Sequence, residues 1–259
     1  MKIIVDAMGG DNAPKQIVLG AAQAAKHLGK KITLVGNMMQ IRDVLKQASI
    51  DEGLFEIIGT SEIISNDEEP AQAVRRKKDS SLCVGLNLAK EEKGSVFISA
   101  GSTGALLAGA LVYMGRIKGI KRPAIAILIP NKSGKMTMLL DAGANADCRA
   151  EYLQQFALMG SIYMKNMYRL EAPKVALLNI GTEAKKGNAL TKETYELLEK
   201  EDIAFVGNVE GRSLFDGECD VIVCDGFSGN LVLKSIEGTA GVIFAGIKEI
   251  MYQSAVTKL

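Results

Sequence analysis

Short apolar runs alternate with longer stretches of helical spacing along most of the chain. The apolar runs are rich in Val, Ile and Leu without regular polar alternation, which is typical of strands buried on both faces of a sheet. The predicted strands are 2–6, 31–35, 54–58, 95–98, 124–129, 135–140, 174–179, 203–206 and 220–224. The predicted helices are 14–28, 39–47, 70–78, 81–92, 102–114, 149–168, 191–200 and 231–252. This alternation predicts an α/β fold, with a parallel sheet covered by helices on both faces.

One pair of strands departs from the parallel pattern. The apolar runs 124–129 and 135–140 flank the polar loop Asn131–Gly134, which predicts an antiparallel hairpin on a mostly parallel sheet. At helix starts, Pro14 suits a first turn, and Thr191 and Thr194 are candidate caps.

Composition restricts the class of protein. The 259 residues are 47% hydrophobic and 24% charged, with a net charge of +1, so no nucleic-acid footprint is expected. We find no signal-peptide pattern and no run of 18 uncharged apolar residues, so a membrane span is not expected. The chain has one histidine, and its cysteines form no CxxC pair, which favours reduced thiols in a cytoplasmic protein and argues against zinc.

Polar, glycine-rich segments follow six of the predicted strands. Ligands in open α/β sheets bind beyond the carboxyl ends of the strands, so we expect these segments to form one shared rim. The segments are 6–14, 99–104, 141–147, 179–188, 207–212 and 225–230.

The segment Ser99–Ala110 carries the most specific chemistry. A strand ends here in small and hydroxyl residues, and an apolar helix follows. The start of a helix presents backbone N–H groups and the positive end of its dipole, which together bind anions. The segment therefore predicts a site for phosphate or for a developing oxyanion.

Several common mechanisms lack their residues. There is no Gly-x-Ser-x-Gly elbow, and His27 lies within a predicted helix, so a Ser-His-Asp triad is not expected. Cys148 and Cys224 lie near the rim without a histidine base. The chain also lacks the Walker and dinucleotide motifs, and no spacing of its acids specifies a metal, so we expect neither cofactor nor metal.

What remains is a rim of amides, hydroxyls and cations, which suits direct transfer to or from an anion. The candidate cations are Arg75, Arg76, Lys185, Lys186, Arg212 and Lys234. The run Arg75–Lys78 is equally well explained as a solvated basic helix end.

The rim segments also resemble the PlsX family, the acyl-ACP:phosphate acyltransferases of bacterial phospholipid synthesis. The resemblance spans essentially the whole chain, with its motifs in the family's order. The matching motifs are Val5–Pro14, Ala73–Lys78, Ser99–Leu106, Arg122–Ala124, Leu140–Asn145, Leu178–Glu183, Lys186–Asn188, Gly207–Glu210 and Asp225–Asn230.

The resemblance implies a Rossmann-like three-layer α/β/α sandwich of the isocitrate dehydrogenase-like and phosphotransacetylase-like type. It also implies that a fatty acyl group passes from acyl carrier protein to inorganic phosphate, which gives acyl phosphate for phospholipid synthesis. The implied protein is a homodimer in the cytoplasm, or is peripheral at the membrane. The family continues past Leu259, so we expect one acyltransferase domain over 1–259 that lacks a C-terminal segment.

From these segments we predict that phosphate lies at Ser102–Gly104 and attacks the thioester directly. The predicted catalytic residues are Lys186, Asn188, Asp225 and Asn230, with amides holding the oxyanion. Asp6, Asp141 or Asp225 would orient phosphate or accept its proton. The predicted substrate-binding residues are Asp6, Gly9, Gly10, Arg76, Ser99, Gly101, Ser102, Thr103, Gly104, Asp141, Asn145, Thr182, Glu183, Asn208, Arg212 and Ser228.

Two other functions stay open at this point: an isocitrate-type NAD-dependent dehydrogenase, and a non-catalytic scaffold that binds acyl carrier protein at the membrane. The apolar stripe of helix 231–252 has two readings as well. It is either a core or dimer-interface face, or an amphipathic surface that docks on a membrane.

Overall fold

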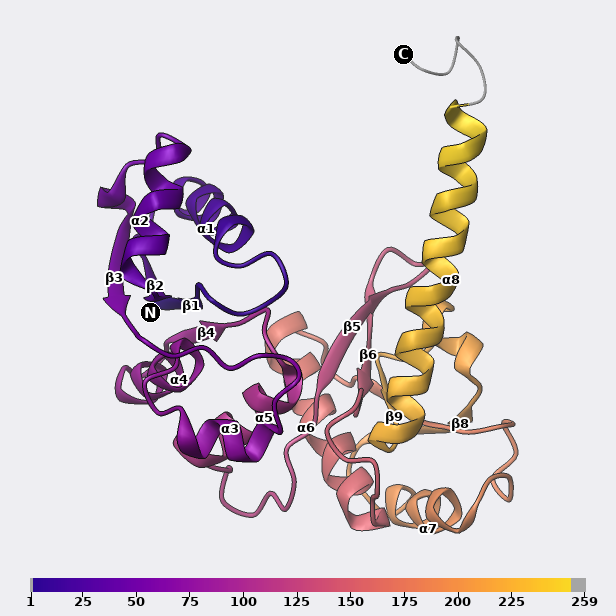
Figure 1. The fold of residues 1–259 in the computed structure, drawn as a ribbon. Helices are drawn as coiled ribbons and strands as arrows, with labels where there is room; N and C mark the ends of the chain where they lie inside the picture. Colours follow the sequence, from indigo (N-terminus) through magenta and orange to yellow (C-terminus); the bar gives the residue numbers. More distant parts are fainter. Residues whose placement is uncertain (1, 253–259) are drawn as a thin grey trace. The chain divides into compact units, whose positions relative to one another are not determined.

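The chain folds into two compact units in this computed structural model, which describes residues 2–252 (Figure 1). Unit 1 is Met1–Ile117 and unit 2 is Lys118–Leu259. Within each unit a β-sheet is covered by helices on both faces, so the predicted three-layer α/β fold is confirmed. Residues 253–259, which follow the predicted helix 231–252, lie outside the described residues.

Unit 1 contains a four-stranded, fully parallel sheet in the order β3-β2-β1-β4. Its strands are β1 (Ile3–Asp6), β2 (Ile32–Gly36), β3 (Phe55–Gly59) and β4 (Val96–Ile98). Its helices are α1 (Lys15–Leu28), α2 (Met38–Gln47), η1 (Glu52–Leu54), α3 (Pro70–Arg76), α4 (Ser81–Glu91) and α5 (Thr103–Tyr113).

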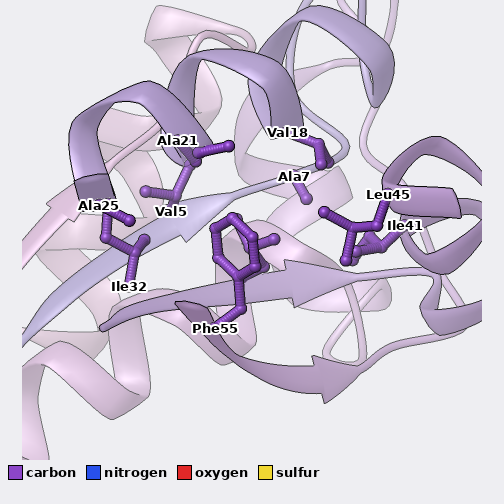
Figure 2. Close-up of a cluster of buried hydrophobic side chains, with 11 residues drawn as sticks. Val5, Ala7, Val18, Ala21, Ala25, Ile32, Ile41, Leu45 and Phe55 are labelled. Carbon is purple, nitrogen blue, oxygen red and sulfur yellow. The ribbon is translucent and has the colours of Figure 1, made fainter. Parts of the chain in front are cut away.

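Successive residues of β1 bury opposite faces of this sheet. Val5 packs with Leu34 and Phe55 against apolar residues of α1 and α2, and Figure 2 shows the side chains of this cluster. Ile4 packs on the other face against Ala89 of α4. Ile3, Ile4 and Val5 therefore form an apolar run without polar alternation, because both faces of the sheet are covered.

Unit 2 contains a five-stranded sheet in the order β5-β6-β9-β7-β8. Only the hairpin pair β5–β6 is antiparallel, as the sequence predicted. Its strands are β5 (Ala126–Pro130), β6 (Met136–Leu140), β7 (Lys174–Leu178), β8 (Ala204–Val209) and β9 (Val221–Val223). Its helices are α6 (Ala150–Tyr168), α7 (Ala189–Leu198), η2 (Gly211–Phe215) and α8 (Gly226–Tyr252).

Different helices cover the two faces of this sheet. Val221 and Val223 face α6 and α7, where Phe156 is fully buried. Ile222 faces Leu214 of η2 and the early turns of α8. Alternation along β9 therefore again places one helical layer on each side.

Two helix starts differ from the prediction by more than one residue. Helix α8 begins at Gly226 rather than at Leu231, so the segment 226–230 is its first turn and not a loop. Helix α7 begins at Ala189 and is capped by Asn188, so neither Thr191 nor Thr194 is the cap. The described strands also divide between two sheets. The prediction of one domain over 1–259 that lacks a C-terminal segment stays a prediction.

The later turns of α8 carry exposed apolar side chains. Val242 and Phe244 are 76% and 70% exposed, and Ile250 is 68% exposed. By length and composition alone, α8 is long and apolar enough to cross a membrane, although its first turns pack on the sheet of unit 2. Length and composition are weak support for a membrane span, and we assign none.

Candidate active site

A buried carboxylate joins the ends of β1 and β4 in unit 1. Asp6 is 2% exposed, and its Oδ2 accepts a 2.7 Å hydrogen bond from the Ser99 hydroxyl. The Ser99 oxygen in turn accepts from the backbone N–H of Gly101 at 3.1 Å, and Asp6 Oδ1 accepts from Met8 N at 3.1 Å. The Asp6 side chain thus holds both the loop after β1 and the loop after β4.

Two glycines allow these loops to lie against each other. A Cβ at Gly9 would be 2.6 Å from Asp6 Oδ2 and 2.8 Å from both Gly101 N and Ser99 Oγ. Gly10 has a φ of 98°, which favours glycine, and a Cβ there would be 2.8 Å from Ala100 O. Both predicted glycines therefore serve close backbone packing.

The β4 loop leads directly into the N-terminus of α5. Ser102 caps this helix by accepting from Ala105 N at 3.3 Å, and Thr103 and Gly104 in its first turn are exposed. A Cβ at Gly104 would be 2.8 Å from Pro70, so this turn has little room on that side.

The strand order places these loops where a ligand is expected. The chain continues from β1 to β2 and β3 on one side of β1, and β4 lies on its other side. The carboxyl ends of β1 and β4 thus flank a topological switch point, where open α/β sheets bind ligands. Asp6, Gly9, Gly10, Ser99, Gly101, Ser102, Thr103 and Gly104 are brought together at this point in unit 1.

A second buried carboxylate organises the end of β6 in unit 2. Asp141 is fully buried and accepts hydrogen bonds of 2.8–3.1 Å from the backbone N–H groups of Ile125, Gly143, Ala144 and Asn145. The Asn145 amide also donates to it at 2.8 Å. Asp141 thus accepts hydrogen bonds from five donors, and these bonds hold the 141–145 loop in place.

The first turn of α8 packs directly on that loop. A Cβ at Gly229 would be 1.9 Å from Asp141 O, and a Cβ at Gly226 would be 2.7 Å from Asn145 O. Asp225 precedes the helix and accepts from Ser228 N at 2.8 Å and from Ser228 Oγ at 2.9 Å. The two glycines therefore permit a contact that any side chain would obstruct.

The 179–188 loop is held by its own amides. Asn179 donates to Lys186 O at 3.1 Å, and Asn188 accepts from Thr191 N at 2.9 Å as the cap of α7. Asn208 on β8 is 4% exposed and donates to Glu183 O at 2.8 Å, while its buried Oδ1 has no partner in the described part of the chain.

A cavity of about 390 Å³ lies among these segments of unit 2. Of the predicted site residues it is lined by Asn188, Asp225 and Ser228. Asn179 and Thr191 also line it, although the sequence predicted no site role for Asn179 and named Thr191 only as a candidate helix cap. The signal for Asn179 was its position directly after β7, at the carboxyl end of a strand, just as Asp225 follows the end of β9 by two residues.

The other predicted residues of unit 2 do not line this cavity. Lys186 is exposed, with its Nζ 3.9 Å from Glu183, and Arg212 is paired with Glu210 at 2.7 Å. Asn230 lies against Gly143, where an added Cβ would be 3.6 Å from it. Thr182 and Glu183 are exposed in the 179–188 loop, and in unit 1 Arg76 is exposed at the end of α3. A pocket shared by all six rim segments stays a prediction.

The cysteines near these loops are poor nucleophiles. Burial raises the pKa of the Cys148 thiol to about 11 and raises that of Cys224 further. A thiol is unreactive until it loses its proton, so both are inert at neutral pH. Within residues 2–252, no cluster of three His, Cys, Asp or Glu is placed to hold a metal.

Comparison with solved structures identifies the fold class. The chain superposes on a phosphotransacetylase from Streptococcus pyogenes with a TM-score of 0.65 and 19% identity, covering 92% of this chain and 82% of that one. For the EutD phosphotransacetylase from Staphylococcus aureus the TM-score is 0.61 at 18% identity, covering 93% and 82%. The protein thus has the phosphotransacetylase-like α/β fold, as predicted.

Sequence comparison then gives the family. A model described as "Fatty acid synthesis protein" matches residues 1–259. Proteins named phosphate acyltransferase from Thermoanaerobacter pseudethanolicus and Brevibacillus brevis are each 49% identical over 260 residues, which is 100% of this chain and 77% of each relative. The chain belongs to the fatty acid synthesis protein family, and the resemblance to phosphate acyltransferases is confirmed.

Proposed function

We propose that the protein is a phosphate acyltransferase, which moves a fatty acyl group from acyl carrier protein to inorganic phosphate. The product is an acyl phosphate for phospholipid synthesis. The observation that carries this proposal is the helix start at Ser102–Gly104, which Ser99 and the buried Asp6 fix in place. The relatives named phosphate acyltransferase support the same reaction.

The proposed chemistry needs no covalent enzyme intermediate. Phosphate binds at the start of α5, where first-turn N–H groups and the helix dipole favour an anion. One phosphate oxygen attacks the thioester carbonyl, the carbon–sulfur bond breaks, and the thiolate of the carrier leaves and takes a proton. Lys186 and Arg212 are the proposed countercharges, because both carry exposed cationic groups.

The loops of unit 2 have proposed roles in handling the thioester. The side-chain amides of Asn188 and Asn230 are donors for a tetrahedral oxyanion, and Asp225 is the proposed proton acceptor. Asp141 is proposed to act by holding the 141–145 loop, since five donors already engage it.

The test is the phosphate dependence of the rate. Purified protein is incubated with palmitoyl-ACP and increasing phosphate, and free thiol and acyl phosphate are both measured. Ser102→Ala and Lys186→Ala are expected to raise the KM for phosphate by about tenfold each, which corresponds to about 1.4 kcal/mol of binding free energy. Lys165→Ala on α6 is the matched lysine control. An unchanged phosphate dependence in both variants contradicts this placement.

The same assay separates the alternatives. Carrier binding without phosphate-dependent thiol release indicates a scaffold, and reduction of NAD indicates a dehydrogenase. Neither alternative is favoured by the relatives or by the fold.

We also propose a homodimer that is cytoplasmic or peripheral at the inner face of the cell membrane. The exposed apolar side chains on α8, including Val242, Phe244 and Ile250, support a surface that is covered in the assembly. Sedimentation velocity measures the oligomeric state. Flotation with anionic vesicles tests membrane docking. If the exposed face of α8 serves only in protein packing, the protein does not bind the vesicles.

A further inference from the structure

The cavity of unit 2 has the wrong charge for phosphate. Among the described residues, no lysine or arginine lines it, and Asp225 contributes a carboxylate. A carboxylate without a countercharge repels an anion, particularly where burial lowers the effective dielectric constant. The nucleophile therefore needs another place, which is consistent with its assignment to the start of α5.

The amide and carboxylate oxygens of this cavity already accept hydrogen bonds within the protein. Asn179 donates to Lys186 O and accepts from Ile180 N, and Asn188 accepts from Thr191 N. Both oxygens of Asp225 accept from Ser228. These hydrogen bonds hold the surrounding loops together and occupy oxygens that would otherwise bind a polar ligand.

The remaining lining is apolar. Leu178 and Ile180 follow β7, Val232 lies in the second turn of α8, and Leu153 of α6 lies among them. Ile180 is 81% exposed, so its side chain offers apolar surface to a ligand. A volume of about 390 Å³ is within the range of small-molecule pockets and is far larger than a phosphate ion needs.

We propose that this cavity is the acyl-chain subsite, in which Leu178, Ile180 and Val232 contact the fatty acyl chain beyond its first few carbons. This inference rests on the proposed acyl transfer and concerns only the acyl chain, because the phosphate is already assigned to the start of α5.

The test is chain-length selectivity. Val232→Phe narrows the cavity, and kcat/KM is measured with butyryl-, octanoyl- and palmitoyl-ACP at saturating phosphate. We expect a loss of about tenfold or more with palmitoyl-ACP and less than about threefold with butyryl-ACP, since a small volume change in an apolar pocket alters discrimination by 10–200-fold. Leu231→Phe is the matched control, because Leu231 is 55% exposed on the same helix and does not line the cavity.

A second variant tests the subsite independently, in case Val232→Phe does not fold. Ile180→Asp changes an exposed position, so folding is preserved, and the added charge is expected to reduce kcat/KM selectively for the long chain. Equal losses for all chain lengths in both variants overturn the subsite. A raised KM for phosphate with unchanged chain preference also overturns it.

Failure of the proposed function gives a different result. In that case the wild-type protein forms no acyl phosphate from any of the three donors. The subsite is then tested by equilibrium binding of palmitoyl-pantetheine without phosphate. Saturable binding to wild type that is lost in Ile180→Asp supports it, and equal binding or no binding contradicts it.

Discussion

The Ser99 hydroxyl lies 2.7 Å from Oδ2 of Asp6 and joins two residues that are 93 positions apart in the sequence. Through its oxygen, Ser99 also accepts from Gly101 N, one residue before the cap of α5. The chain of contacts therefore runs from a buried carboxylate at the end of β1 to the helix start that we assign to phosphate.

Removing this hydroxyl tests the connection. Ser99→Ala leaves Asp6 Oδ2 and Gly101 N without their partner, and an unsatisfied buried group costs about 1–3 kcal/mol. We expect the free energy of unfolding to fall by about that amount, and the KM for phosphate to rise more than kcat changes. Urea denaturation and initial-rate kinetics measure the two effects.

Ser95→Ala is the matched control in the same unit. The Ser95 hydroxyl is buried, and it has no hydrogen-bond partner in the described part of the chain. Its removal deletes a buried hydroxyl that has no partner, so we expect the free energy of unfolding to stay the same or to rise and the phosphate KM to stay unchanged. If Ser99→Ala behaves in the same way as Ser95→Ala, the Asp6–Ser99 contact does not position the helix start.

The Asp141 carboxylate gives a second prediction. In Asp141→Asn an NH₂ group replaces one oxygen and faces backbone N–H donors, so at least one of the five hydrogen bonds becomes a clash of donors. We expect a loss of at least about 2 kcal/mol in the free energy of unfolding, because hydrogen bonds to charged groups are the strong ones. Asp147→Asn, at an exposed position, should be neutral, and equal effects would show that Asp141 does not hold the loop.

The strands and most helices could be predicted because their sequences depend on local burial. Every residue of β2 is buried, so the sequence of this strand directly reflects its place in the interior of the sheet. The start of α8 was predicted wrongly, since Gly226 and Gly229 resemble turn residues. They are helical because only glycine fits against the backbone of Asp141 and Asn145, a contact between distant segments that hydrophobic periodicity does not encode.

The candidate site could be predicted only in part, for a similar reason. Polar residues after each strand were identified from the rule that ligands bind at strand ends. Which of them meet depends on strand order, and the insertion of β9 between β6 and β7 brings Asp225 near Asn179. The engagement of Asp141 by five donors, and the pairing of Arg212 with Glu210, likewise follow from tertiary geometry.

The Cys148 thiol provides a prediction about pH. Burial raises its pKa to about 11, so the folded protein holds this proton in a range where the unfolded chain, with a thiol pKa of about 8.5, has lost it. The unfolded state then binds fewer protons, so the free energy of unfolding falls as pH rises from about 8.5. We expect Cys148→Ser to weaken this alkaline dependence, as measured by denaturation at several pH values. Iodoacetamide at pH 7.5 is expected not to inactivate the wild-type enzyme, and rapid inactivation that Cys148→Ser abolishes would contradict an inert thiol.

Two glycines of α8 are expected to respond in opposite ways to the same substitution. A Cβ at Gly229 would lie 1.9 Å from Asp141 O and 2.9 Å from Cys224 Sγ, so Gly229→Ala must displace the helix start or the 141–145 loop. Overpacking of this kind costs about 1–3 kcal/mol or more. Gly238 has nothing within 4 Å of an added Cβ, and alanine in a helix interior is more stable than glycine by about 0.5–1 kcal/mol.

Thermal unfolding of both variants, with activity assayed in parallel, therefore tests how α8 is joined to the site. Gly229→Ala should lower the melting temperature and reduce acyl transfer, because Asp225 and Ser228 at the helix start move with it. Gly238→Ala should raise the melting temperature slightly and leave the rate unchanged. If both substitutions are neutral, the first turn of α8 does not depend on close contact with Asp141, and the cavity beside it is not held in the shape described above.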